Sequence, residues 1–284
     1  MSKNRIKDSY PHIRDLFSFS KEEVLRLKKY SSQIYPQDEL RLPFGRVDID
    51  HLEVLDLSLR SLLEIDTFQK KKKDFRRRLL SDEFEETLTE IVIGGLLTQS
   101  NIPIRSFEYE YRYDNNLKDT KDLDICALIG DHEVFFEIAT RRKYNHKRIV
   151  GIQGIDGMHF RNIRRKYEDK KIEQAHRSRL LPAQPLIFVI NSFRSLQHVF
   201  LNNAEPFLGK CELLHSLIMF SGYRIVNDGV KLSQANIYCN PWCTDSIKYM
   251  VDNKILTELI KNWSVDIRYD LEVQQKTLNG RSVR

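Results

Sequence analysis

The sequence predicts an α/β protein with a mixed central sheet flanked by helices, and with a helical extension at its N-terminus. Two observations lead to this fold class. Residues 104–140 read as three short strands joined by turns, and helical patterns surround them. The apolar run 185–192 begins at a proline, Pro185, and is typical of a strand buried on both faces.

The N-terminal part of the chain lacks the alternation that marks strands. The segment "SKEEVLRLKKYSSQI" opens with a serine N-cap signal and repeats apolar residues near helical spacing. A second helical segment, 48–65, leads into the basic stretch 70–78. We therefore divide the chain into a helical extension, residues 1–80, and an α/β domain, residues 81–284.

The α/β domain begins with a predicted helix, "DEFEETLTEIVIGGLLTQS", which carries a D-x-x-E capping box made by Asp82 and Glu85. A strand over 104–113 follows, and then the strands 122–129 and 133–140. The two residues between the last pair are Gly-Asp, an order that fits a type II′ hairpin.

A glycine-rich connection, 151–157, precedes the rest of the domain. Because it follows a charged loop and not a strand, it gives weak support for a phosphate-binding loop. The remaining pattern predicts a long helix over 158–181, the buried strand 185–192, a helix over 211–223, a strand within 233–241 and a closing helix over 244–263.

The formal net charge is +6, and the excess is concentrated in 70–78, 141–148 and 161–171. Such clusters suit a phosphate backbone, although solvated helix faces explain most charge runs. No segment approaches the ~20 apolar residues that span a bilayer, and the first residues lack a secretory signal. We expect a cytoplasmic protein that does not contact a membrane.

The chain has four cysteines, and only Cys239 and Cys243 are close in sequence. Their spacing is not that of a zinc knuckle, and no second Cys/His pair matches it, so we expect reduced thiols. The motifs G-x-S-x-G and H-E-x-x-H and the Walker A loop do not occur. The histidines are dispersed, and His159 and His176 on the basic helix are interpreted as surface residues and not as ligands.

Two carboxylates, Asp124 and Glu137, lie inside apolar strand-like runs, where an unpaired charge is costly. A hairpin with Gly130 and Asp131 at its tip places these two acids opposite each other on neighbouring strands. Two like charges about 5 Å apart repel unless they share a cation. Hard oxygen ligands at this separation suit Mg²⁺ or Mn²⁺.

Other residues could complete this site. Glu90, with Glu86 as second choice, lies on the preceding helix beside its apolar stripe. On the helix 158–181, Lys171 continues the helical spacing of Ile163 and Tyr167, so we expect it to face inward. An inward lysine needs an anion, and a metal–phosphate site supplies one; the alternative is that Lys171 extends outward to solvent.

This order of elements resembles the PD-(D/E)XK nuclease superfamily over residues 82–245. The quoted pattern is a helix with a Glu, a strand with Asp124, a strand "FFEIAT", a helix with "KKIEQ" and the buried strand "PLIFVIN". The resemblance implies a restriction-endonuclease-like αβββαβ core. It also implies that Asp124 binds metal, that Glu137 is the acid of the E-x-K element, and that Glu90 is the helical acid.

The chain departs from the family at Ala139, where E-x-K usually has lysine. Some branches resemble this chain in moving the lysine to the following helix, often near a glutamine. Lys171 and Gln174, spaced Lys-x-x-Gln, match that variant, and Lys143 is a second candidate because it shares strand parity with Glu137.

The resemblance implies a Mg²⁺- or Mn²⁺-dependent nuclease, with DNA favoured over RNA, in defence, restriction or repair. Analogy with such nucleases also implies protein partners in a larger complex. Asp124, Glu137, Glu90 and the Ile138 carbonyl would hold the metal, and Lys171 and Gln174 would act on the water or the phosphate. The residues that would follow the nucleic-acid backbone are Arg141, Arg142, Lys143, Arg164, Arg165 and Lys166. Two alternatives remain: a catalytically inactive subunit that binds nucleic acid or supports a complex, and a purely structural role of the acids in ion pairs.

Overall fold

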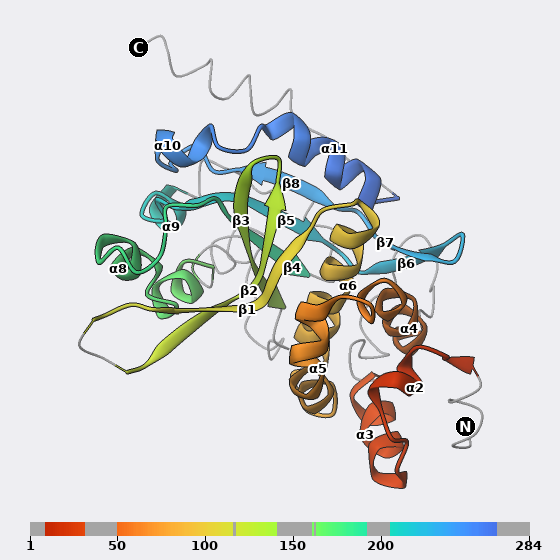
Figure 1. The fold of residues 1–284 in the computed structure, drawn as a ribbon. Coiled ribbons are helices and arrows are strands. Elements are labelled where there is room, and N and C mark those ends of the chain that lie inside the picture. The colour runs from red at the N-terminus through yellow and green to blue at the C-terminus, as the bar shows by residue number, and fades with distance from the viewer. Residues whose placement is uncertain are drawn as a thin grey trace, which may run out of the picture.

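The computed structural model of the chain describes residues 9–31, 50–115, 118–140, 161, 163–191 and 205–265. Its centre is a six-stranded sheet with the order β1-β2-β3-β4-β5-β8 (Figure 1). The strands are β1 (Ile104–Arg112), β2 (Thr120–Ile129), β3 (His132–Thr140), β4 (Leu186–Asn191), β5 (Leu214–Phe220) and β8 (Asn236–Cys239). The chain is thus an α/β protein, as the sequence predicts.

The sheet is mixed. Strands β1, β2 and β3 form an antiparallel meander, and β4 and β5 run parallel to β3. Strand β8 closes the far edge antiparallel to β5. All six residues of β4 are buried, which confirms the prediction of a strand covered on both faces. A separate hairpin consists of β6 (Tyr223–Val226) and β7 (Gly229–Leu232).

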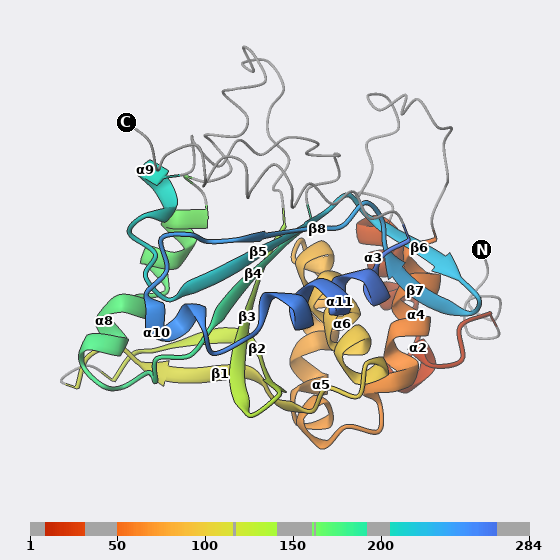
Figure 2. The same ribbon diagram turned by 90° about the horizontal axis from the view of Figure 1, so that it is seen from above.

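Helices cover both faces of the sheet (Figure 2). One layer shares a hydrophobic cluster with the sheet and contains α2 (Ile13–Leu16), α3 (Lys21–Ser31), α4 (His51–Leu62), α5 (Asp66–Leu79), α6 (Phe84–Gln99) and α11 (Asn253–Trp263). The opposite cluster contains the helical residues 163–169, α8 (Ile172–Arg177), α9 (Glu205–Leu208) and α10 (Asp245–Lys248). No helix in the described ranges has the length and apolar character needed to cross a bilayer.

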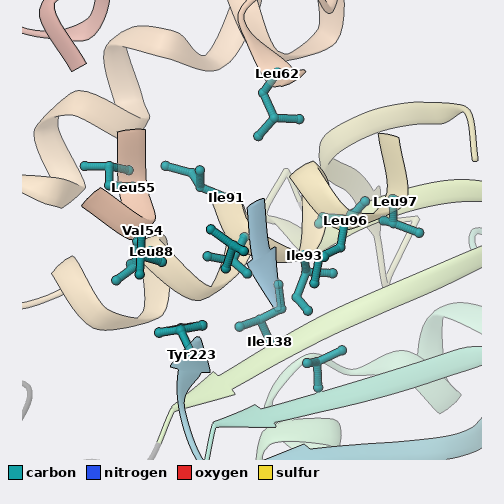
Figure 3. Close-up of a cluster of buried hydrophobic side chains, with 14 of the residues drawn as sticks. Val54, Leu55, Leu62, Leu88, Ile91, Ile93, Leu96, Leu97, Ile138 and Tyr223 are labelled. Carbon is teal, nitrogen blue, oxygen red and sulfur yellow. The ribbon is translucent and has the colours of Figure 1, made fainter. Parts of the chain in front are cut away.

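Helix α6 lies at the centre of the first layer. Its Leu88 and Ile91 lie in one buried cluster with Val54 and Leu55 of α4 (Figure 3). A Cβ atom on Gly95 would lie 3.1 Å from the Ser58 carbonyl oxygen, so glycine allows α4 and α6 to cross closely. The predicted helix is confirmed, but its predicted capping box is not formed, because the N-cap is Glu83 and makes no side-chain cap.

The described helices of the N-terminal extension share the hydrophobic core on one face of the sheet. On α5, the rings of Phe68 and Phe75 stack with centroids 5.0 Å apart. Both rings meet Phe107 of β1 edge-on, at 5.7 and 5.4 Å. Edge-to-face and offset aromatic pairs add to the free energy gained by burial alone. Helix α5 is thus fixed against the first strand of the sheet.

Three helix predictions were wrong in whole or part. The segment 211–223 is mainly the strand β5, because a fully buried strand and a buried helix give the same continuous apolar run. The closing helix is two helices, α10 and α11, since Asp252 caps α11 by accepting from the Lys254 N–H at 2.8 Å. The long helix over 158–181 ends in its middle, at Lys171.

The sequence interpretation also missed the β6–β7 hairpin. Its turn places Asn227 and Asp228 at φ 49° and 58°. Asparagine and aspartate tolerate this left-handed region better than most residues, and such a pair is typical of a tight hairpin turn.

Candidate active site

The β2–β3 hairpin has the predicted register. Gly130 has φ +61°, and the paired positions run from Ile129 opposite His132 to Ile125 opposite Phe136. One step further along this register are Asp124 and Glu137. The backbone ladder ends before that step, so the two acids lie where β2 and β3 stop pairing.

At this opening, side chains form the hydrogen bonds of the β3 backbone groups. The Ile138 N–H donates to Asp124 Oδ2 at 2.5 Å, and the Ile138 carbonyl accepts from Lys166 Nζ. In a continued ladder both groups would bond to β2. The carboxylate of Asp124 therefore replaces one backbone bond, and the ammonium of Lys166 replaces another.

Glu137 is a fully buried carboxylate with two lysines beside it. Its Oε1 lies 3.0 Å from Lys166 Nζ and 3.1 Å from Lys170 Nζ. Within the described ranges neither oxygen meets a donor in hydrogen-bond geometry. Burial, and then the charge of Asp124, raise the pKa of Glu137 to about 7, although the two lysines oppose this shift.

Lys166 Nζ is the point where three oxygens converge. It lies 2.8 Å from Glu86 Oε1 on α6, close to Glu137 Oε1, and donates to the Ile138 carbonyl. Burial acts to lower the pKa of Lys166, but the charges of Glu137, Asp124 and Glu86 raise it above its ordinary value. Lys166 is thus an ammonium cation held by oxygens from a helix and a strand.

Lys170 is the second cation on Glu137. Its Nζ donates to the Asp122 carbonyl at 2.8 Å and lies 3.0 Å from Asp122 Oδ1. The Tyr111 hydroxyl donates to the Lys170 carbonyl at 2.7 Å, which ties the end of the 163–169 helix to β1. The charges of Glu137, Asp124 and Asp122 overcome burial and raise the pKa of Lys170.

Glu90 has a different partner. It is fully buried, not at the edge of the buried face as its place beside the stripe suggested, and its Oε2 lies 2.8 Å from Arg78 Nη2 on α5. Burial, and then the charge of Asp124, raise the pKa of Glu90 well above its ordinary value, while Arg78 opposes the shift. Arg78 also lies 3.5 Å from Glu108 Oε1.

The acids around Asp124 share a small set of cations. In the described part of the chain, the acids Glu86, Glu90, Glu108, Asp122 and Glu137 pair with the cations Lys71, Arg78, Lys166 and Lys170. Lys71 and Arg78 also pair with Glu110, Asp74 and Glu83. Burial and the charge of Asp124 raise the pKa of Glu90 and of Glu137, so a metal ion bound here would compete with protons for these acids.

The donor set decides which metal would fit. No group of three or more His, Cys, Asp or Glu side chains is arranged to hold a metal within the residues that the structure describes. Carboxylates and a backbone carbonyl are nevertheless hard ligands, and Mg²⁺ is usually bound by one or two carboxylates while it keeps several waters. Glu137 Oε2 meets no hydrogen-bond donor in the described residues and fits such an ion, whereas Oε1 is paired with Lys166 and Lys170.

The expectation that Lys171 faces inward is wrong. Lys171 and Gln174 are both exposed. Lys171 has φ 56°, a left-handed conformation that ends the helix, and its N–H donates to the Glu168 carbonyl at 3.0 Å. Because the helix stops there, the phase counted from Ile163 and Tyr167 no longer applies to Lys171.

A signal for the two inward lysines was present in the sequence. Ile163, Lys166, Tyr167 and Lys170 stand at i, i+3, i+4 and i+7, the spacing of one helix face. Ile163 and Tyr167 are buried, so that face is the inner one. Lys166 had been assigned to the nucleic-acid backbone, and Lys170 had been given no role.

The basic residues proposed to bind nucleic acid are placed only in part. Arg141, Arg142 and Lys143 lie outside the described residues. Arg165 is exposed, and Arg164 pairs with Glu168 at 2.7 Å. In the basic stretch 70–78, four residues form ion pairs with acids of the chain, namely Lys71, Arg76, Arg77 and Arg78.

The geometry thus brings Asp124, Glu137 and the Ile138 carbonyl together, as expected. It places Glu86, the second choice for the helical acid, beside them and adds Lys166 and Lys170. Chemically, such a cluster can hold a cation and, beside it, place ammonium groups for an anion. A comparison of this chain with protein families, curated proteins and solved structures found no match in any of the three.

Proposed function

We propose that this protein is a metal-dependent nuclease, with Mg²⁺ or Mn²⁺ as its cofactor and a phosphodiester of nucleic acid as its substrate. The observation that supports this most is the meeting of Asp124, Glu137 and the Ile138 carbonyl at the opening between β2 and β3. The element order also agrees with a restriction-endonuclease-like core: α6 comes first, then the β1–β2–β3 meander, the helical residues 163–169 with α8, and β4.

The residues would divide the work as follows. Asp124, Glu137 and the Ile138 carbonyl would hold the ion, which when bound supplies positive charge for the phosphate and a more acidic water. Lys166 and Lys170 replace Lys171 and Gln174 in our assignment, because their ammonium groups reach Glu137. With raised pKa values they are charged near neutral pH, so they would bind the scissile phosphate and not accept a proton from water.

The test is cleavage of plasmid DNA, linear DNA and RNA with Mg²⁺, Mn²⁺ or EDTA. Asp124→Asn keeps an oxygen for the Ile138 N–H but loses the charge. We expect it to lower metal-dependent cleavage by about a hundredfold or more, since losing even an outer partner of a ligand costs 10–100-fold. The matched control is Asp131→Asn at the exposed hairpin tip, which should keep the wild-type rate.

One observation favours a second function, a nucleic-acid-binding subunit without catalysis. Lys166 and Lys170 are both paired with acids, and Ala139 stands where the family has lysine. This alternative predicts salt-sensitive binding of DNA or RNA without turnover. Absence of cleavage under every metal condition, together with such binding, would replace the nuclease proposal by this one.

A further inference from the structure

The oxygens around Lys166 resemble a cation site that is already filled by the protein itself. Glu86 Oε1, Glu137 Oε1 and the Ile138 carbonyl oxygen all contact the same nitrogen, Lys166 Nζ. Two of these three groups, Glu137 and the Ile138 carbonyl, belong to the metal set of the proposed nuclease. A metal bound by them would therefore compete with the ammonium for the same oxygens.

The surroundings of Lys166 favour such an exchange. Its side chain is 25% exposed, whereas that of Glu137 is fully buried, so part of the lysine lies at the protein surface and the acid does not. Lys170 also contacts Glu137 but is held in addition by Asp122, and no contact joins it to Glu86 or to the Ile138 carbonyl in the described residues. The two lysines thus differ in one respect: only the ammonium of Lys166 lies within this set of three oxygens.

We propose that the Lys166 ammonium occupies the divalent-cation site of the metal-free protein, and that Glu86, not Glu90, is the helical acid of that site. Metal binding then requires Lys166 to leave, after which its charge is available for a phosphate oxygen next to the ion. Glu90 stays paired with Arg78. This inference rests on the proposed function for the identity of the metal, but it concerns metal binding and not cleavage.

The experiment measures Mn²⁺ binding to the purified full chain by titration calorimetry, with no nucleic acid present. If Lys166 fills the site for nine-tenths of the time or more, removing it raises the apparent affinity by the inverse of the free fraction, about tenfold or more. We therefore expect Lys166→Met to bind Mn²⁺ at least tenfold more tightly than wild type. The matched control is Lys170→Met, which removes the same charge from Glu137 but leaves the oxygens around Lys166 filled.

A second variant tests the site without removing the lysine. Glu86→Gln takes one charged oxygen from the set and should weaken Mn²⁺ binding, whereas Glu83→Gln, an exposed acid one turn earlier that pairs with Arg78, should not. Thermal unfolding in EDTA would establish that each variant is folded.

Any of three results would overturn this inference. Lys166→Met could bind Mn²⁺ no more tightly than wild type, Lys166→Met and Lys170→Met could gain the same affinity, or Glu86→Gln could bind Mn²⁺ as tightly as wild type. The nuclease proposal is tested by a different result, the cleavage of nucleic acid. If Lys166→Met binds Mn²⁺ more tightly but no metal-dependent cleavage occurs, the cation exchange stands and the catalytic assignment does not.

Discussion

At the scale of single residues, Glu137 combines full burial with a neighbouring acid. An acid whose pKa is raised on folding, here to about 7, keeps its proton in the native state over a range where the unfolded chain has lost it. Between the ordinary glutamate pKa of about 4.3 and pH 7, Glu137 therefore binds more protons in the native state than in the unfolded state. The contribution of Glu137 to the free energy of unfolding must fall as the pH rises through this interval.

We expect Glu137→Gln to remove this fall, because an amide does not titrate. The free energy of unfolding of wild type should decrease with pH more steeply than that of the variant, by up to about 1.4 kcal/mol per pH unit for one proton. Urea unfolding in EDTA from pH 4.5 to 7.5 measures both slopes. Glu90, whose pKa is also raised, is present in both proteins and cancels in the comparison. Parallel pH curves would contradict the prediction.

Some residues of the candidate site can be predicted from the sequence, and others cannot. Asp124 and Glu137 followed from the hairpin, because a two-residue turn fixes the register of everything after it. Lys171 did not follow from helix phase, because "KYEDKKIEQ" contains no glycine or proline at the point where the helix ends. The contacts of Lys170 with Tyr111 and Asp122 join residues distant in sequence, and no local pattern shows them.

At the scale of elements, the strands of the meander and the strand β4 were predicted well, whereas β5 was predicted as a helix. The strands of the β1–β2–β3 meander alternate in part, and their predicted bounds agree with the structure within two residues. All seven residues of β5 are buried, and there the apolar run carries no period from which strand and helix could be distinguished. Burial on both faces thus leaves the type of an element undecided unless a flanking residue marks it, as Pro185 does for the run that forms β4.

The helix end at Lys171 leads to a prediction about stability. A left-handed backbone costs a residue with a Cβ atom about 1–2 kcal/mol, and glycine avoids this cost but loses part of the gain as entropy. We expect Lys171→Gly to raise the free energy of unfolding by about 0.5–1 kcal/mol and to leave Mn²⁺ affinity unchanged. Lys171→Ala, which keeps the Cβ atom, is the control and should not stabilise the protein. A loss of Mn²⁺ binding with either variant would show that Lys171 contributes to the metal site.

At the scale of the whole molecule, the N-terminal extension contributes to the candidate site. Arg78 comes from α5, and its partner Glu90 comes from α6 in the α/β domain. The charge of Asp124 acts on both residues. The acids of the site are therefore balanced in part by a cation from outside the stretch 82–245 that resembles nucleases. A boundary at residue 80 describes the sequence pattern, but the electrostatics of the site cross it.

The coupling free energy between Arg78 of the N-terminal extension and Glu90 of the α/β domain can be measured. Arg78→Met leaves Glu90 buried without its cation, and breaking a buried ion pair by removing one partner costs about 3–5 kcal/mol. We expect a loss of that size in urea unfolding at pH 8. Arg77→Met is the matched control: its residue is adjacent on the same helix and pairs with Asp74, but it is exposed. An exposed pair contributes at most about 1 kcal/mol.

The double variant Arg78→Met/Glu90→Met distinguishes an uncompensated charge from a general loss of packing. If the cost of Arg78→Met comes from the charge left on Glu90, removing that charge as well should recover most of the lost stability, since apolar replacements of a buried pair are often neutral. If the double variant is as unstable as the sum of the single ones, the Arg78–Glu90 pair does not couple the extension to the site. Recovery would instead mean that Arg78 of α5 is needed chiefly to neutralise an acid beside Asp124.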